Sequence, residues 1–363
     1  MDLNQILDKA VQYNASDVHM QAGSHILLRI GGQLRSVESA PLEEKQLTEF
    51  LLHLAGEERS QLLRSQRSVD FAYQPSDKAR FRVSLFFQRG SVRAAFRTLP
   101  TTVPSFDSLN LPSAVRSFAE EERGLVLVTG TTSSGKSTTV AALIDYINAT
   151  RRRTIVTIED PIEFVHHDKK SMVSQREVGT DTPGFAEALR RVLRQDPNVI
   201  FVGELRDYET MATATRAADT GHLVFSTVHT TNATQTLQRI SAMFPPEERD
   251  LLTMQLASNL LGAISLRLAT ATGEKTRIPV VEIMRSTPII RKIILERRFT
   301  ELSEALASRE MGMQLFDQHL VELVKSRRIQ NREGLRLASN PEHVAMALAG
   351  ISSEDLAGGI IGN

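Results

Sequence analysis

The stretch GLVLVTGTTSSGKSTT, Gly124–Thr139, decides the fold of this chain. Its apolar start has the length of a buried strand, its middle fits the pattern G-x-x-x-x-G-K-[ST], and a helical pattern follows in STTVAALIDYIN. In a strand–loop–helix context, backbone N–H groups of such a loop and the following helix N-terminus bind phosphate. The stretch therefore predicts a nucleotide site; a glycine-rich turn that binds no nucleotide is the simpler alternative.

Each residue type in the loop has an expected task. The glycines permit a tight turn, Lys136 is expected to reach the β- and γ-phosphates of ATP, and Ser137 is expected to ligate Mg²⁺. The predicted nucleotide-binding residues are Gly130, Thr131, Thr132, Ser133, Ser134, Gly135, Lys136, Ser137 and Thr138.

Composition limits the classes of protein that the chain can represent. Its 363 residues are enough for two domains, and 43 basic residues balance 43 acidic ones, which gives no overall attraction to nucleic acid or anionic lipid. Cysteine is absent, so disulfides and thiolate metal sites are impossible. The N-terminus lacks the basic flank and apolar run of a signal peptide, and no apolar run has the length of a membrane span. A cytosolic protein is the default expectation.

The first hundred residues predict a small α+β domain. Residues 1–20 have an amphipathic helical pattern, and two hairpins are expected, one around Gly31-Gly32 and one near Arg89-Gly90. We assign residues 1–98 to this domain and residues 99–115, which contain three prolines, to a linker. The linker is either a hinge or an ordinary packed connector.

The remainder predicts a second domain of α/β class over residues 116–350, with a flexible tail at 351–363. Short apolar runs at 124–130, 154–160, 198–204 and 223–229 alternate with helical stretches. This alternation predicts a parallel sheet with helices on both faces, in which ligands bind at the carboxyl ends of the strands. From about residue 245 onward we expect mostly helices.

Acidic residues follow two of the predicted strands. Glu204 ends NVIFVGE and is a candidate for completing the Mg²⁺ site, although Asp is the usual acid there. TIEDPIEF contributes Glu159, Asp160 and Glu163, one of which could position or activate water beside the metal. Surface acids around a proline turn are the alternative interpretation.

The segment GHLVFSTVHTTNA carries His222 and His229 at the two ends of a predicted strand. His229 ends that strand at the edge where Glu204 and Glu159 are expected, so its imidazole could sense the γ-phosphate by hydrogen bonding. A lone histidine is more often structural or solvated. Zinc is not expected, because no further ligand lies at metal-binding spacing.

Taken in order, GTTSSGKS, TIEDPIEF, NVIFVGE and GHLVFSTVHTTNA resemble the Walker A, aspartate, Walker B and histidine boxes of the RecA-like secretion ATPases. The early ASDVHMQAG, the central SQREVGTDTPGFAEALRRVLRQDPNVIFVGELRDYETM and the late GMQLFDQHLVELV are similar to the type IV pilus retraction ATPases, the PilT-like branch. The resemblance implies a PAS-like N-terminal domain, a RecA-like ATPase domain with C-terminal helices, and a homohexamer that binds ATP with Mg²⁺ between its two domains.

The resemblance also implies roles for individual residues. Glu204 would be the Walker B acid and a Mg²⁺ ligand through water, Glu163 the favoured water-activating acid with Glu159 as alternative, and His222 and His229 the histidine-box pair. Arginines of the N-terminal domain would approach the phosphates; the candidates are Arg80, Arg82 and Arg97, for which solvated strand arginines are the alternative reading.

Two departures from the family pattern stand out. Ser134 is assigned to a position where many members have glycine, and IIRKIILE, Ile289–Glu296, replaces the AIRNLIRE-like helix linked to retraction. The second departure leaves open a main retraction motor or an accessory, PilU-like paralogue. The implied partners are other copies of the chain, an inner-membrane platform protein to which the ring is peripherally attached, and a paralogous retraction ATPase.

Three other functions compete. Pilus-extension and type II secretion ATPases usually carry a four-cysteine zinc module and a longer N-terminal region, which this chain lacks. A nucleic-acid motor would need a basic groove and stacking aromatics, but aromatic residues make up only 5% of the chain, without tryptophan. A small-molecule kinase would need an acceptor site that the sequence does not indicate. We therefore expect no nucleic-acid partner.

Overall fold

The computed structural model describes residues 3–37, 40–76, 78–273 and 276–350, so the predicted tail at 351–363 lies outside the described residues. Two compact units divide the chain. Unit 1 comprises Met1–Val103 together with Asp160–Val165 and Glu177–Asp181, and unit 2 contains the rest. Two short segments that follow the start of unit 2 in the sequence therefore belong to unit 1.

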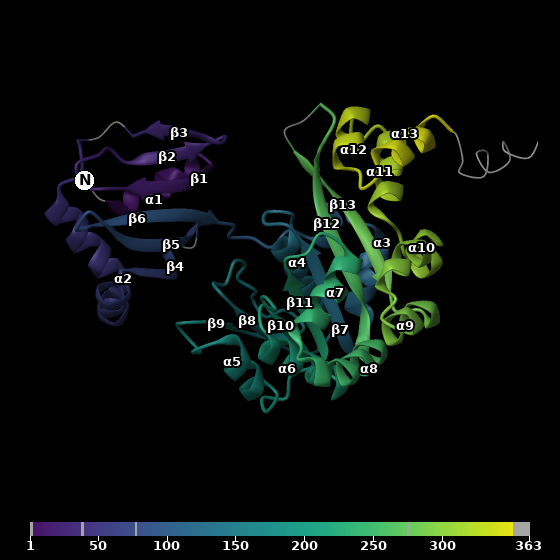
Figure 1. Ribbon diagram of the computed structural model, residues 1–363. Helices are drawn as coiled ribbons and strands as arrows, with labels where there is room; N and C mark the ends of the chain where they lie inside the picture. Colours follow the sequence, from purple (N-terminus) through teal and green to yellow (C-terminus); the bar gives the residue numbers. More distant parts are fainter. Residues whose placement is uncertain (1–2, 38–39, 77, 274–275, 351–363) are drawn as a thin grey trace, which may run out of the picture. The chain divides into compact units, whose positions relative to one another are not determined.

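Unit 1 is a six-stranded sheet with two helices (Figure 1). Its strand order is β3-β2-β1-β6-β5-β4, and the neighbours pair antiparallel. The elements are α1 Leu3–Gln12, β1 Ala15–Met20, β2 Leu27–Ile30, β3 Gln33–Ser36, α2 Glu44–Gln66, β4 Ser68–Ser76, β5 Ala79–Gln88 and β6 Ser91–Leu99.

Both predicted hairpins form, because their turn residues take the positive φ that two-residue hairpin turns require. Gly31 and Gly32 have φ of 58° and 83°, and Arg89 and Gly90 have φ of 51° and 89°. The predicted helix over 1–20 is wrong in its second half. Asn14, at φ 52°, ends the turn after the helix, and the residues that follow form β1.

Unit 2 contains a seven-stranded sheet in the order β13-β12-β7-β11-β10-β8-β9. Strands β12, β7, β11, β10 and β8 run parallel, and β13 runs antiparallel to β12. The strands are β7 Gly124–Gly130, β8 Thr154–Glu159, β9 Met172–Glu177, β10 Val199–Val202, β11 Leu223–Val228, β12 Leu260–Thr270 and β13 Arg277–Arg285. The sheet is thus mixed, and four of its parallel strands coincide with the predicted apolar runs.

Helices cover both faces of this sheet. Val126 and Val128 of β7 share a core with Val140 and Leu143 of α4, whereas the alternate residues of β7 point to the face contacted by α6. The helices are α3 Ser113–Arg116, α4 Lys136–Thr150, α5 Phe185–Val192, α6 Tyr208–Asp219, α7 Ala233–Met243, α8 Arg249–Asn259, α9 Pro288–Leu295, α10 Leu302–Ala307, α11 Phe316–Lys325, α12 Asn331–Leu337 and α13 Pro341–Leu348.

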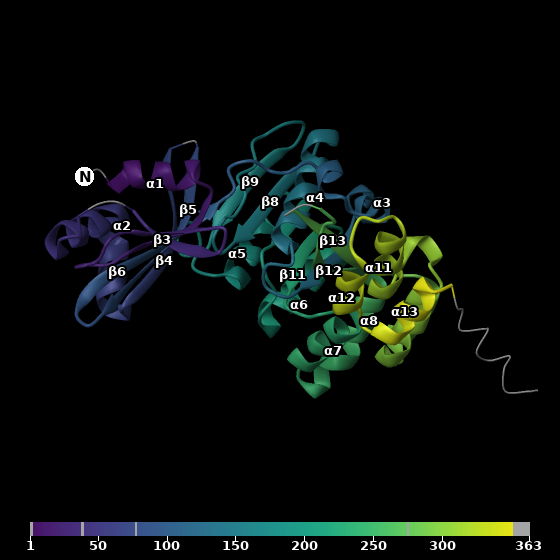
Figure 2. The same ribbon diagram turned by 90° about the horizontal axis from the view of Figure 1, so that it is seen from above.

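The expectation of mostly helical structure after residue 245 is wrong for β12 and β13, which form a long buried hairpin. Gly262 of β12 explains part of the close packing, because a Cβ there would lie 2.0 Å from the Met284 carbonyl oxygen. Helix α11 packs against β13 and α12 against β12, and α13 packs on these two helices (Figures 1 and 2). No helix in the described part of the chain is long and apolar enough to span a membrane.

The predicted linker contains an ordered part of unit 2. Leu99 ends β6, and unit 2 begins at Pro104. Phe106 and Val115 are buried in the core of unit 2, beside α4. Of the predicted linker, only the residues before Pro104 belong to unit 1.

Candidate functional site

The predicted phosphate loop lies between β7 and α4. Gly135 precedes the helix at φ 97°, and Lys136 is its first residue. The ammonium Nζ of Lys136 donates to the carbonyl oxygens of Gly130 and Thr131, both at 2.9 Å, and the side chain is only 8% exposed. The lysine is therefore held across the loop from which it is expected to contact phosphate.

Backbone conformation distinguishes Ser134 from its neighbour Ser133. The serine in the left-handed region is Ser133, at φ 64°, so glycine would be favoured at 133 rather than at 134. Ser134 is buried, and its Oγ lies 2.3 Å from the position that a Cβ on Gly130 would occupy. The Ser134 hydroxyl thus fills the space left by Gly130, and it has no hydrogen-bond partner in the described structure.

Polar residues from the neighbouring strands gather at the edge where the loop lies. In the parallel register, Val228 of β11 pairs with Thr129 of β7, and Val202 of β10 pairs with Ser226 of β11 and with Ile158 of β8. The strands β7, β8, β10 and β11 therefore end together.

Glu204 and His229 meet at this edge. The imidazole Nε2 of His229 lies 3.4 Å from Oε1 of Glu204, while Arg206 contacts Oε2 of the same carboxylate at 2.8 Å. The Glu204 side chain is 17% exposed and that of His229 39% exposed. The turn after β10 is fixed to β11, because Thr227 donates its hydroxyl to the Gly203 carbonyl at 2.6 Å. Arg206 was not predicted, although its position two residues after Glu204 could have indicated it.

Glu159 ends β8 and is buried. Its Oε1 accepts hydrogen bonds from the Thr157 hydroxyl at 2.7 Å and from the Gln175 amide at 3.1 Å. Part of its acceptor capacity is thus used within unit 2. Glu163 belongs to the Asp160–Val165 segment of unit 1, so the two predicted acids of TIEDPIEF belong to different units.

The structure places His222 at the opposite edge of the sheet. It directly precedes β11, its carbonyl accepts a hydrogen bond from the N–H of Gly124 at the start of β7, and its Nδ1 lies 2.9 Å from the Ala217 carbonyl. Of the two predicted histidines, only His229 lies at the loop edge, since the strand itself separates them.

The three predicted arginines share one face of the unit 1 sheet. Arg82 is opposite Arg97 across β5 and β6, and Arg97 is opposite Asp17 across β6 and β1. Arg97 pairs with Asp17 at 3.4 Å, and Arg80 donates to the Ile162 carbonyl at 3.1 Å. Within the described ranges, Arg82 forms no hydrogen bond or ion pair. Its guanidinium could therefore bind an added anion without breaking such a contact.

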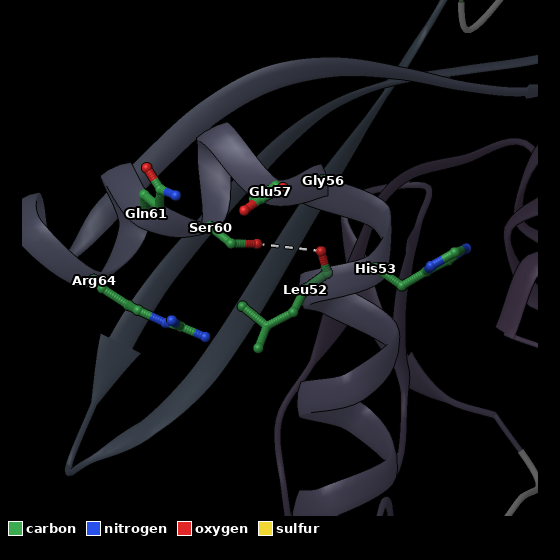
Figure 3. Close-up of a pocket in the computed structure, with 7 residues that line it drawn as sticks. All are labelled: Leu52, His53, Gly56, Glu57, Ser60, Gln61 and Arg64. Carbon is green, nitrogen blue, oxygen red and sulfur yellow. Dashed lines mark hydrogen bonds between the residues drawn. The ribbon is translucent and has the colours of Figure 1, made fainter.

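A separate hollow lies in unit 1, where α2 is kinked at Gly56 (Figure 3). Gly56 has φ 75°, and the Ser60 hydroxyl donates to the Leu52 carbonyl at 3.2 Å across the kink. The hollow measures about 430 Å³ and is lined by Leu52, His53, Gly56, Glu57, Ser60, Gln61 and Arg64. It includes none of the predicted site residues.

Comparisons with known proteins agree with the motifs. The model of the type II/IV secretion system protein family matches residues 1–291. The chain is 41% identical to the type IV pilus retraction ATPase PilT of Pseudomonas aeruginosa, over 94% of this chain and all of that protein. It is 35% identical to the type IV pilus ATPase PilU of the same organism, over 96% of this chain and 91% of that protein.

A solved structure shows the same relationship in three dimensions. The crystal structure of the pilus retraction motor PilT with bound ADP matches with a TM-score of 0.87 at 41% identity, covering 94% of this chain and 98% of that one. The resemblance to PilT-like secretion ATPases, indicated by the four sequence boxes, is thereby confirmed. The chain belongs to the type II/IV secretion system protein family.

Proposed function

We propose that this protein is an ATPase that powers retraction of type IV pili as a homohexameric ring. The observation that carries the proposal is the loop edge of unit 2, where Lys136 spans the phosphate loop and the Glu204–His229 pair stands at the end of neighbouring strands. Similarity to a pilus retraction ATPase over nearly the whole chain supports the direction of the motor. In this proposal unit 1 is the PAS-like domain and unit 2 the RecA-like domain.

The residues of the loop fit a nucleoside triphosphate. Gly130 has no side chain to block the loop, and Lys136 lies over two loop carbonyls that phosphate oxygens would replace as its partners. Ser137 and Glu204 would hold Mg²⁺, Glu204 through water. In the described ranges no three acidic or histidine side chains cluster as a metal site, which agrees with a metal held mainly by phosphate and water oxygens.

The acids and the histidine divide the remaining tasks. We propose Glu163 as the acid that positions the attacking water, since Glu159 already accepts hydrogen bonds from Thr157 and Gln175. His229 would form a hydrogen bond with the γ-phosphate. Its contact with Glu204 would couple the presence of the γ-phosphate to the position of the acid beside the metal. Arg82, which is uncommitted in unit 1, is our first candidate among the arginines for a phosphate contact.

The assembly and its location follow from the proposed function. The ring would act at the cytoplasmic side of the inner membrane, against a platform protein of the pilus machine, and a paralogous ATPase could share the work. An accessory, PilU-like role is the second candidate. The observation in its favour is the substituted segment on α9, where Ile289 and Leu295 are exposed.

The experiment is replacement of Lys136 by alanine in the source cell, with Lys325→Ala on the exposed end of α11 as the matched loss of a lysine. Lys136→Ala should abolish ATP hydrolysis, leave normal or excess surface pili, and abolish twitching, whereas Lys325→Ala should change none of these. Bald cells would contradict retraction and point to extension. Strong stimulation of the purified ATPase by DNA would contradict the pilus assignment.

A further inference from the structure

Glu282 is a buried carboxylate that the predicted site does not include. It lies on β13 and is 6% exposed. Its Oε1 accepts hydrogen bonds from the backbone N–H of Ala233 at 2.8 Å and from the Ser265 hydroxyl at 3.3 Å. Burial of a carboxylate is costly, so its presence here calls for a specific task.

Ala233 is the first residue of α7, and the turn from His229 to Asn232 joins β11 to that helix. The first N–H groups of a helix have no partner within the helix, and the helix N-terminus carries partial positive charge. A carboxylate from β13 therefore satisfies one of these groups and fixes the start of α7 to the β12–β13 hairpin.

Further hydrogen bonds fix the turn between β11 and α7 to the start of α7. The Asn232 side chain accepts from the Gln235 N–H at 2.8 Å, and the hydroxyls of Thr230 and Thr236 lie 2.6 Å apart. Arg239 of α7 donates to the carbonyl of His229 at 3.3 Å. A displacement of the α7 N-terminus would therefore also displace His229.

We propose that Glu282 is a positioning residue of the ATPase site: it holds the N-terminus of α7 and thereby sets the imidazole of His229 against Glu204. The inference rests on the proposed ATPase function. Glu282 does not touch the reacting groups. It acts through the turn between β11 and α7. Substitution of Glu282 would therefore lower the activity by displacing His229.

Two charged groups near Glu282 come from β12 and from the C-terminal helices. Arg267 of β12 lies in its electrostatic field, stacks on the Phe316 ring at 3.9 Å and donates to the Leu337 carbonyl. Asp317 of α11 is the other charged group that acts on it. Glu282 thus lies between the turn that carries His229 and the α11–α12 region.

The test compares Glu282→Ala, which removes the acceptor, with Glu282→Gln, which keeps an oxygen acceptor for Ala233. Asp317→Ala is the matched control, because Asp317 is also buried and accepts two backbone N–H groups, those of Ser339 and Asn340, away from the turn. ATPase kcat and KM, ADP affinity and the melting temperature are measured for the purified full chain. The single variant His229→Ala and the double variant Glu282→Ala/His229→Ala complete a double-mutant cycle in kcat.

We expect Glu282→Ala to lower kcat about tenfold with KM and ADP affinity within twofold of wild type, and Glu282→Gln to recover most of kcat. Asp317→Ala should lower the melting temperature without lowering kcat. The double variant should be no slower than His229→Ala, because coupled residues are not additive. Equal kcat in Glu282→Ala and wild type, or full additivity in the cycle, would overturn the positioning role. Lack of hydrolysis by the wild-type protein would instead overturn the proposed function.

Discussion

Exchanging single serines of the phosphate loop for glycine should have opposite effects at adjacent positions. Ser133 has φ 64°, in the region that costs an L-residue about 1–2 kcal/mol. Glycine removes this cost but adds about 0.5–1 kcal/mol of conformational entropy to the unfolded chain. Ser133→Gly should therefore stabilise the protein by roughly 0.5–1 kcal/mol.

Ser134 has no positive φ to relieve, and its buried side chain fills the space beside Gly130. Ser134→Gly therefore carries the entropy cost of glycine and also leaves a small void, which together should destabilise the protein by about 1–2 kcal/mol. The two variants should thus differ by roughly 2 kcal/mol, which corresponds to about 4–8 °C in melting temperature for a domain of this size.

The assay is scanning calorimetry of the wild type and both variants, with the dissociation constant for ADP measured by titration. Because Ser133 already holds the loop shape, Ser133→Gly should leave the ADP dissociation constant within about threefold of wild type. The reasoning would be refuted if Ser134→Gly melted at the same temperature as Ser133→Gly or above it. That order would mean that the left-handed residue of the loop is not Ser133.

Three further predictions concern the β12–β13 hairpin. Gly262→Ala should destabilise unit 2 by about 3 kcal/mol or more in urea unfolding, because the new Cβ would meet the Met284 carbonyl at 2.0 Å and the Phe118 ring at 2.9 Å; a loss below about 0.5 kcal/mol would contradict this. Burial raises the pKa of the Glu282 carboxyl from 4.5 to about 7, so the stabilisation by its neutral form is complete below pH 4.5 and is lost as the pH rises through 7. We therefore expect the unfolding free energy of the wild type to fall by up to about 3 kcal/mol relative to that of Glu282→Gln between pH 4.5 and 8. If the unfolding free energies of the two proteins changed with pH in parallel, Glu282 would not be the group responsible. Arg285→Lys should cost about 1–2 kcal/mol in the same unfolding assay, because the buried guanidinium stacks on the Phe118 ring at 3.9 Å, and an unchanged midpoint would show that stacking contributes little.

The loop edge of unit 2 was predictable because local patterns determine it. Each apolar run, from GLVLV to LVFSTV, is fully buried and forms a strand, and parallel strands with helical crossovers must end on a common edge. Glu204 and His229 follow the apolar parts of β10 and β11, so the topology alone predicts that these two residues lie near each other. The 3.4 Å approach of His229 to Glu204 is the geometric result of that topology.

The remaining site residues depend on contacts that no short window of sequence contains. Glu282 reaches Ala233 across 49 positions of the chain, and LLGAISLRLAT is as compatible with a buried helix as with β12. The choice of strand is made by Gly262, whose lack of a side chain allows β13 to approach. Periodicity cannot reveal such a contact, because it is made by the fold as a whole.

Arg80 shows how the structure changes the interpretation of a predicted residue. Its guanidinium donates to the Ile162 carbonyl and lies 3.7 Å from Glu177, whose carboxylate accepts from the N–H groups of Ile162 and Ala72. All four residues belong to unit 1, and Glu163 directly follows Ile162. If Glu163 is the acid that we propose, Arg80 would affect hydrolysis by fixing the backbone beside that acid. For Arg80 the expected signature of substitution is therefore a fall in kcat, whereas for the uncommitted Arg82 it is a loss of ATP affinity.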